Sequence, residues 1–147
     1  MQYWFEYLSA KPFINTPQLS AGRYYLQMKV RAIRGATQLQ VDDQDEMASA
    51  VTELLTAIFE QNQLSTEDLI SIHFTSTSDL VSDFPAKAAR SLDLGLIPLI
   101  CSTEISVPGA LPRVIRVMVH AYTSRRHEEI AHIYRRGAEV LRRDLAQ

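Results

Sequence analysis

The sequence predicts an α+β protein in which one long and one short helix pack on a β-sheet of four or five strands. Segments 69–75 and 114–122 have the apolar, β-branched composition of strands, and segment 43–63 carries apolar residues at helical spacing. With 147 residues, the chain can form one domain with its own core. Two helices cover one face of such a sheet, so we expect oligomerisation to cover the other face.

The first strand is predicted to start near Tyr24, because apolar and polar residues alternate from there to Ile33. Gly35 is expected to end it. Residues 1 to about 23 mix aromatic residues with proline, serine and glycine and show no sustained period, so we interpret them as an appendage.

The long helix is predicted over residues 43–63. Its apolar face consists of Met47, Val51, Leu54, Leu55 and Ile58. Either Asp42 or Asp43 can cap its first turn, and Asn62 with Gln63 closes it. The segment 65–68 (STED) has a capping signature that restarts the chain before the strand 69–75.

The second half of the chain is predicted to hold the short helix and the remaining strands. Pro85 suits the first position of a helix that continues to Leu92. Strands follow over 97–101 and 114–122. For the last stretch, we favour a short strand at 131–134 plus a helical turn over one weak helix interrupted by Gly137.

Composition excludes several classes of function. A net charge of −2 gives no electrostatic footprint for nucleic acid, and no apolar run approaches the roughly 20 residues that cross a membrane. The single cysteine excludes an internal disulfide, and residues 1–14 do not resemble a signal peptide, so we expect a cytoplasmic protein. The four histidines lack metal-ligand spacing, so no metal site is expected, and there is no phosphate-binding glycine loop.

Charged residues at strand positions are the candidates for a binding site. Arg116 interrupts an apolar strand, where a guanidinium is costly without an anionic partner; it is either a paired core arginine or part of an anion site. Arg34 precedes Gly35 and is either an exposed strand-end residue or a second cation of that site. Alternation points Arg31 to the opposite face from Arg34. Glu104 either lies solvated in a loop or meets an arginine or a ligand hydroxyl.

Cys101 lies in an apolar run without a nearby base, so we interpret it as a small buried residue and not as a nucleophile. The residues by themselves therefore indicate a domain with a site for a small anion. Several separated segments make a more specific match: RAIRGAT (31–37), FPAKAAR (84–90), Cys101 with Glu104, IRVM (115–118), HIY (132–134) and LRRDL (141–145). In this order and spacing, they closely resemble the monofunctional chorismate mutases of the pseudo-α/β-barrel type, over about residues 28–145.

The resemblance implies a mixed sheet and a homotrimer that forms a barrel-like assembly, with each active site between neighbouring subunits. It implies a chorismate mutase domain over 28–147 and an N-terminal extension over 1–27. The implied reaction is the Claisen rearrangement of chorismate to prephenate, in phenylalanine and tyrosine biosynthesis, without cofactor or metal. Two alternatives are a trimeric imine or enamine deaminase of similar fold and a non-catalytic trimer that binds a small carboxylate.

The resemblance also implies roles for individual residues. Arg34 would bind a substrate carboxylate, and Arg116 would reach a carboxylate and the ether oxygen of the breaking bond. Glu104 and Cys101 would meet the ring hydroxyl, and Tyr134 the side-chain carboxylate. The remaining expected site residues are Phe84, Ala86, Lys87 and Arg90 from across the interface, and Leu99, Ile100, Leu141 and Arg142 near the wall or mouth. The chain departs from the family pattern at Ser78, where many relatives have proline, and at Ile100, where a threonine can occur.

Overall fold

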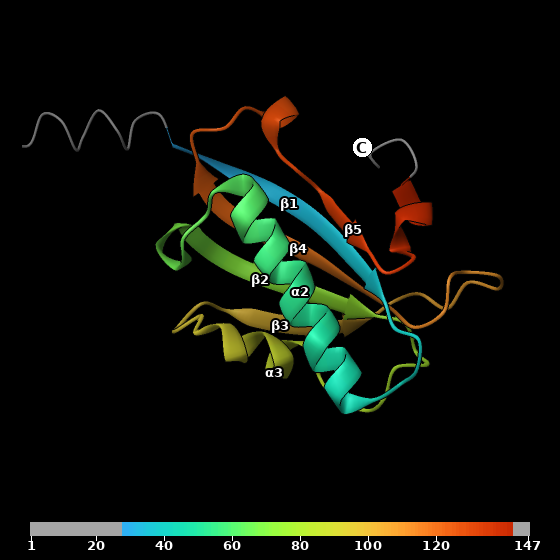
Figure 1. Ribbon diagram of the computed structural model, residues 1–147. Coiled ribbons are helices and arrows are strands. Elements are labelled where there is room, and N and C mark those ends of the chain that lie inside the picture. Colours follow the sequence, from blue (N-terminus) through green and yellow to red (C-terminus); the bar gives the residue numbers. More distant parts are fainter. Residues whose placement is uncertain (1–27, 143–147) are drawn as a thin grey trace, which may run out of the picture.

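Five strands form one mixed sheet, with the order β3-β2-β4-β1-β5 and the helices α2 and α3 on one face (Figure 1). The computed structural model describes residues 28–142. The strands are β1 (Lys29–Gln38), β2 (Leu69–Ser76), β3 (Leu99–Thr103), β4 (Val114–Thr123) and β5 (Ile133–Arg135); the helices are α2 (Gln44–Asn62) and α3 (Pro85–Ala89). Short 3-10 helices are η1 (Thr66–Asp68), η2 (Arg90–Leu92), η3 (His127–Glu129) and η4 (Ala138–Arg142). The predicted α+β class is confirmed.

Strand β4 is the centre of the sheet and pairs antiparallel with both β1 and β2. Outside them, β3 runs parallel to β2, and β5 runs parallel to β1. This order brings β1, β2 and β4, which are far apart in the sequence, side by side at the middle of the sheet. Side chains that alternate onto one face of these strands can therefore form a common surface.

Helix α2 matches the predicted helix closely. Asp43 is its N-cap, because the Asp43 carboxylate accepts hydrogen bonds from the backbone N–H groups of Asp45 and Glu46 at 2.9 and 3.0 Å. Gln63 ends the helix in the left-handed conformation, with φ of 55°. Ser65 and Asp68 form the predicted capping box at η1.

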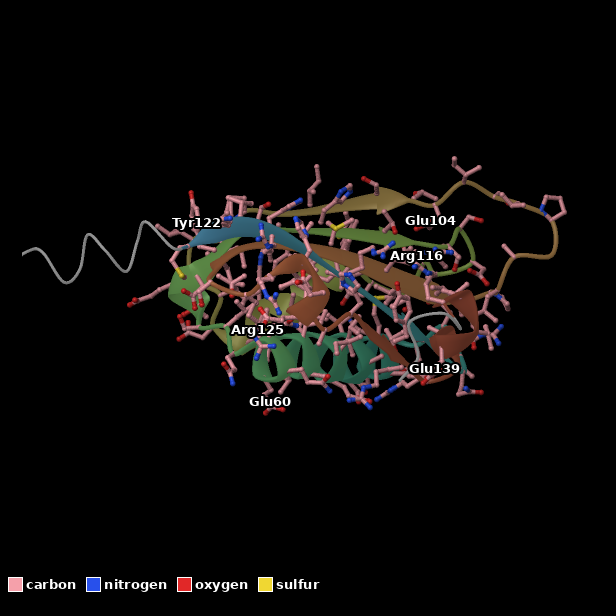
Figure 2. All side chains as sticks on the ribbon, turned by 90° about the horizontal axis from the view of Figure 1, so that it is seen from above. Glu60, Glu104, Arg116, Tyr122, Arg125 and Glu139 are labelled. Atoms are coloured by element: carbon pink, nitrogen blue, oxygen red, sulfur yellow. The ribbon has the colours of Figure 1, made fainter. Side chains whose placement is uncertain are left out.

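The hydrophobic core lies between α2 and the sheet. The apolar face of α2 is fully buried there, together with Ile33, Ile72, Phe74 and Val119 from the strands. On β4, burial alternates, because the residues between the core side chains, Arg116 and Tyr122 among them, lie on the other face. Figure 2 shows Arg116 and Glu104 on the side of the sheet away from α2. The face opposite α2 thus remains accessible in the single chain.

The predicted end of the first strand at Gly35 is wrong. Strand β1 continues to Gln38, and Gly35 pairs with Val117 on β4 and Ile133 on β5. A Cβ atom at Gly35 would lie 2.8 Å from Cδ1 of Ile58 and 3.0 Å from Cγ1 of Val117. The glycine therefore serves the close packing of α2 on the sheet and not a turn. The part of the predicted strand before Met28 lies outside the described residues.

Smaller differences concern the later strands. β3 begins at Leu99 instead of 97, because Pro98 accepts a hydrogen bond from the Ile72 N–H at 3.0 Å but has no N–H to donate. The favoured interpretation of the last stretch is confirmed, since β5 is followed by η4.

Within the described part of the chain, no helix is long and apolar enough to cross a membrane.

Candidate active site

A pocket of about 350 Å³ lies on the face of the sheet opposite α2, over the middle of β1, β2 and β4. Its volume suits a small molecule. It is lined by Arg34, Gly35, Ala36, His73, Thr75, Glu104, Arg116, Val117, Met118, Tyr134, Leu141 and Arg142. Strand alternation explains why residues two positions apart line the pocket together. His73 and Thr75 on β2 point to the same face of the sheet, as do Arg116 and Met118 on β4.

The pocket is suited electrostatically to a small dianion. Three guanidinium groups, of Arg34, Arg116 and Arg142, and one carboxylate, of Glu104, leave it with a net charge of +2. Because the whole chain has a net charge of −2, this positive region is local and not part of a general field. Guanidinium groups can bind carboxylates through two parallel hydrogen bonds, so the pocket can orient such a ligand as well as attract it.

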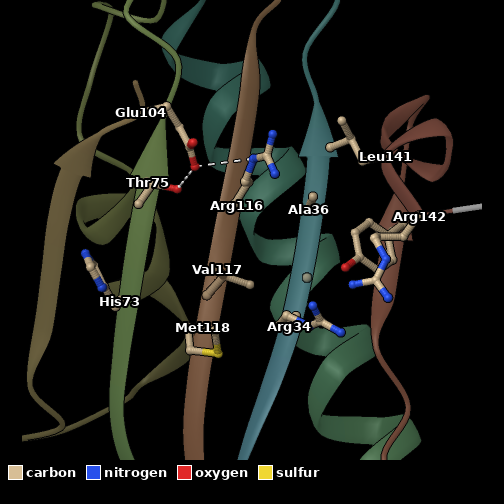
Figure 3. Close-up of a pocket in the computed structure, with 12 residues that line it drawn as sticks. Arg34, Ala36, His73, Thr75, Glu104, Arg116, Val117, Met118, Leu141 and Arg142 are labelled. Carbon is tan, nitrogen blue, oxygen red and sulfur yellow. Dashed lines mark hydrogen bonds and ion pairs between the residues drawn. The ribbon is translucent and has the colours of Figure 1, made fainter. Parts of the chain in front are cut away.

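Glu104 fixes one of these arginines. Its Oε1 lies 3.3 Å from Nε of Arg116 and also accepts a hydrogen bond from the Thr75 hydroxyl (Figure 3). The backbone N–H of Glu104 donates to Ser76 at 2.8 Å, which holds the carboxylate at the end of β3 beside β2. The contact uses Nε of Arg116 and leaves the two terminal nitrogens as donors for a ligand.

The expectation that Arg116 needs an anionic partner is confirmed, but its setting differs from a core arginine. Its side chain is 45% exposed, because β4 buries only one face under α2. The apolar residues on both sides of Arg116 in the sequence point to the helices, while Arg116 points to the pocket. Its position is therefore that of an anion site on an open sheet face.

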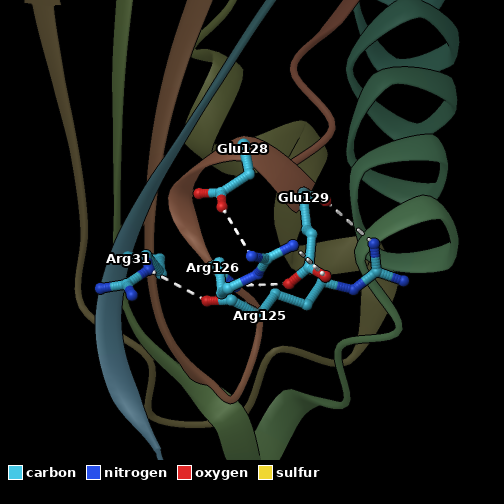
Figure 4. Close-up of polar contacts among 5 residues, drawn as sticks. All are labelled: Arg31, Arg125, Arg126, Glu128 and Glu129. Carbon is cyan, nitrogen blue, oxygen red and sulfur yellow. Dashed lines mark hydrogen bonds and ion pairs between the residues drawn. The ribbon is translucent and has the colours of Figure 1, made fainter.

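Arg34 lies within β1 and not at a strand end, which corrects the predicted setting. Among residues 28–142, no carboxylate forms an ion pair with its guanidinium. Its backbone N–H donates to Nδ1 of His132 at 3.1 Å. Arg31 points away, as predicted: its Nε donates to the Arg125 carbonyl at 3.1 Å, beside the contacts of Arg126 with Glu128 and Glu129 (Figure 4).

The last described segment closes one side of the pocket with Tyr134, Leu141 and Arg142. Arg136 and Gly137 turn the chain there with φ of 54° and 99°. The Arg136 guanidinium lies 2.7 Å from a carboxylate oxygen of Glu53 and donates to the Ser49 hydroxyl at 3.0 Å, both on α2. These contacts tie the turn to the helix, so η4 is held against the sheet.

Seven of the predicted site residues lie outside this pocket in the same chain, four of them around α3 and three on β3. Phe84, Ala86, Lys87 and Arg90 belong to α3, its N-cap and η2, on the helix side near β3. The Phe84 side chain is 71% exposed, which is unusual for a large aromatic group. Lys87 pairs with Asp83 at 2.7 Å. Hydrogen bonds from Gln44, from Lys87 and from the Phe84 backbone lower the pKa of Asp83 to about 2.

Strand β3 carries the other three predicted residues. Leu99 and Cys101 pack against the core on the helix side, whereas Ile100 points to the open face and is 59% exposed. A contact of Cys101 with a ligand would therefore involve its backbone and not its thiol. β3 is an edge strand in the single chain, so one row of its backbone groups is available for such a contact.

Thr75 and His132 are functional candidates that sequence reasoning missed. Thr75 lies in the predicted strand 69–75, and its alternation with Phe74 places it on the polar face of β2, but the strand pattern does not indicate its contact with Glu104. His132 does not line the pocket, and in the sequence it stands out only as the first residue of the HIY motif. No sequence signal indicates that its ring reaches the backbone of Arg34, 98 positions away.

The fold and the pocket define an α+β protein with a site for a small dianion on its open sheet face. The family model described as chorismate mutase type I matches residues 30–145, and the chain belongs to this family, whose members are isomerases. Chorismate mutase AroH of Thermus thermophilus is 43% identical over 117 residues, covering 79% of this chain and 96% of the relative. Chorismate mutase AroH of Bacillus subtilis is 38% identical over 120 residues, covering 81% and 94%. A chorismate mutase structure from Clostridium thermocellum superimposes with a TM-score of 0.73 at 44% identity, covering 75% of this chain and 98% of that one.

Proposed function

We propose that this chain rearranges chorismate to prephenate and that its active site is the arginine pocket completed by a neighbouring subunit. The observation that carries the proposal is the pocket with a net charge of +2, in a chain of this family. Chorismate is a dianion with two carboxylates, so three guanidinium groups around one carboxylate match its charge. The reaction is a unimolecular Claisen rearrangement, which requires neither a nucleophile nor a proton donor from the protein.

Arg34 is assigned to substrate binding, whereas Arg116 is assigned both to a carboxylate and to the ether oxygen of the breaking bond. Arg34 binds one substrate carboxylate, and Tyr134 meets the side-chain carboxylate. These contacts select the compact conformer in which the reacting carbons meet. Negative charge builds on the ether oxygen as the carbon–oxygen bond breaks, and Arg116 stabilises it more than in the ground state. Its ion pair with Glu104 and its place on the central strand hold the guanidinium in advance.

The assembly is proposed to be a homotrimer. The pocket is open in the single chain, and Phe84, Lys87 and Arg90 lie on a different surface of the same chain. An exposed Phe84 and an accessible sheet face are the kinds of surface that subunits cover. In the trimer, the pocket of one subunit would be lined by residues around α3 of the next subunit: Phe84, Ala86, Lys87 and Arg90.

The direct test is to follow the loss of chorismate absorbance and to identify the product. Prephenate as the product is the expected result. Binding of chorismate without conversion would contradict the proposal and favour the non-catalytic carboxylate-binding trimer. Turnover of an imine or enamine, with chorismate untouched, would favour the deaminase.

Cys101→Ser is expected to retain substantial activity, because the thiol packs against the core and only the backbone is positioned to reach a ligand. Placing a hydroxyl in this partly apolar environment should cost about 1 kcal/mol of unfolding free energy. Steady-state kinetics and thermal unfolding measure the two effects. Complete loss of turnover in a folded protein would indicate a thiol-dependent reaction.

Deletion of residues 1–27 is expected to leave activity largely unchanged. The family match begins at residue 30, and the pocket is lined by residues from Arg34 onward. We therefore propose residues 28–147 as the catalytic domain and 1–27 as an extension. Measuring kcat/KM and the unfolding temperature of the shortened chain tests this boundary. If the shortened chain does not fold, the extension is part of the structure.

A further inference from the structure

His132 lies outside the pocket lining but binds the backbone of Arg34, a residue that lines the pocket. Its Nδ1 accepts the hydrogen bond from the Arg34 backbone N–H, directly before the point where β1 and β5 begin to pair at Gly35 and Ile133. The imidazole therefore accepts the hydrogen bond that a backbone carbonyl would accept if the pairing of β1 with β5 began one residue earlier. On the β4 side, Arg34 lies in the antiparallel ladder opposite Met118, whereas on the β5 side its backbone N–H is bound by a side chain.

Asn62 fixes the chain next to His132. The Asn62 side chain is buried at the end of α2, and its amide donates to the Ala131 carbonyl and accepts from the Ala131 N–H, both at 2.9 Å. A second donor bond, to the Ile58 carbonyl at 2.9 Å, fixes the amide itself. Because both backbone groups of Ala131 are bound, His132 follows a segment with little freedom to move.

The surroundings of His132 favour its neutral form. Burial, followed by repulsion from the guanidinium groups of Arg34 on β1 and Arg142 in η4, lowers the pKa of His132 below its ordinary 6.5. His132 directly precedes β5, the titratable Tyr134 follows two residues later on that strand, and α2 contributes the uncharged Asn62, which binds the neighbouring Ala131. A neutral ring that accepts at Nδ1 carries its proton on Nε2. The Arg34 bond is therefore present at neutral pH and is lost as the pH falls through this pKa.

We propose that His132 is a positioning residue of the active site: as a neutral imidazole it fixes the backbone of Arg34 on the β5 side so that the guanidinium meets a substrate carboxylate, and its protonation removes this contact. This inference rests on the proposed function, because it assigns the effect to carboxylate binding by Arg34. A displacement of about 1 Å can cost roughly 100-fold in rate, so a single backbone hydrogen bond beside the binding arginine is sufficient.

The variants His132→Asn and His132→Ala separate this role from general packing. The Asn side chain can place its oxygen close to the position of Nδ1 and does not titrate, whereas Ala removes the acceptor. We expect His132→Ala to raise KM roughly tenfold or more, with a smaller fall in kcat, and His132→Asn to restore most of the affinity. His127→Ala, at the exposed η3, is the matched control and should behave like the unchanged protein.

The pH profile gives a readout that packing alone would not change. Between about pH 5 and 8, kcat/KM of the unchanged protein should fall on the acid side of the His132 pKa, and this fall should be reduced in His132→Asn. Effects of substrate protonation are common to both proteins and cancel in the comparison. An identical acid fall in His132→Asn, or an unchanged KM in folded His132→Ala, would overturn the inference. If His132→Ala does not fold, the comparison with His132→Asn decides.

Imidazole nitrogen shifts measured by NMR test the arrangement independently of activity. The expected spectrum shows His132 with an unprotonated Nδ1 at neutral pH and a pKa below the ordinary histidine value of 6.5. A proton on Nδ1 would contradict the inference whatever the substrate is. Absence of chorismate turnover in the unchanged protein would refute the proposed function instead, while the NMR result would still report on the bond to Arg34.

Discussion

Arg116→Lys is expected to lower kcat by about 100-fold to 1,000-fold, the usual effect of removing one donor that stabilises transition-state charge. Lysine keeps the positive charge but cannot pair with Glu104 through one nitrogen and direct two others at a carboxylate and the ether oxygen. KM should change much less, because Arg34 and Arg142 still attract the substrate. Steady-state kinetics of chorismate loss measure both constants.

Stability separates this mechanism from a structural role for Arg116. The Arg116 side chain is 45% exposed and its partner Glu104 is 25% exposed, so the ion pair should contribute no more than about 1 kcal/mol to stability. Arg116→Lys should therefore remain folded, with an unfolding temperature close to that of the unchanged protein. Arg126→Lys, at an exposed ion pair outside the pocket, is the control for a change of cation type. A folded Arg116→Lys protein with normal kcat would refute the proposed mechanism.

The position of Arg116 also shows what local patterns can predict. Alternation along 114–122 and 69–75 predicts the two strands correctly and indicates which side chains share a face of the sheet. It also shows that a charged residue interrupts an apolar strand. It could not show whether that face is buried. That α2 covers only one face of the sheet is a property of the whole fold, and for this reason Arg116 is a half-exposed residue that lines the pocket and not a core residue.

Gly35 shows a second limit. A glycine after a run of alternating residues usually indicates the end of a strand, and the sequence contains no sign that Ile58 would approach it from a helix. Because β1 continues past Gly35, Arg34 lies within the strand and shares the pocket face with Ala36. Likewise, the contact of His132 with Arg34 joins residues 98 positions apart, and such pairings follow from sheet order and not from local spacing.

The family motifs imply a larger site than the pocket of the single chain contains. Arg34, Glu104, Arg116, Tyr134, Leu141 and Arg142 meet in one pocket of the single chain. Phe84, Ala86, Lys87 and Arg90 occupy a separate surface on α3 and η2. Since helices on one side of a sheet cannot reach a pocket on its other side, the two groups can meet only between subunits. Subunit mixing tests this directly.

Arg90→Ala and Arg116→Ala proteins are each expected to be nearly inactive, and mixed trimers of the two are expected to regain activity. A site that combines Arg116 of one subunit with Arg90 of the next is intact wherever an Arg90→Ala subunit supplies the pocket and an Arg116→Ala subunit supplies α3. With random assembly of equal amounts, about one quarter of the sites satisfy this condition. Co-refolding followed by a chorismate assay should therefore recover about a quarter of the normal activity.

Two controls make the result decisive. Mixing Arg34→Ala with Arg116→Ala should recover no activity, because both residues line the same pocket of one chain and every site lacks one of them. Native mass spectrometry with one of the two proteins labelled with 15N confirms that mixed trimers have formed, because two Arg→Ala chains otherwise have the same mass. Recovery with Arg90→Ala and none with Arg34→Ala would establish a shared site with this division of residues. Confirmed mixed trimers without recovery, or an active monomer by light scattering, would show that Arg90 and Arg116 do not act at a common site between subunits.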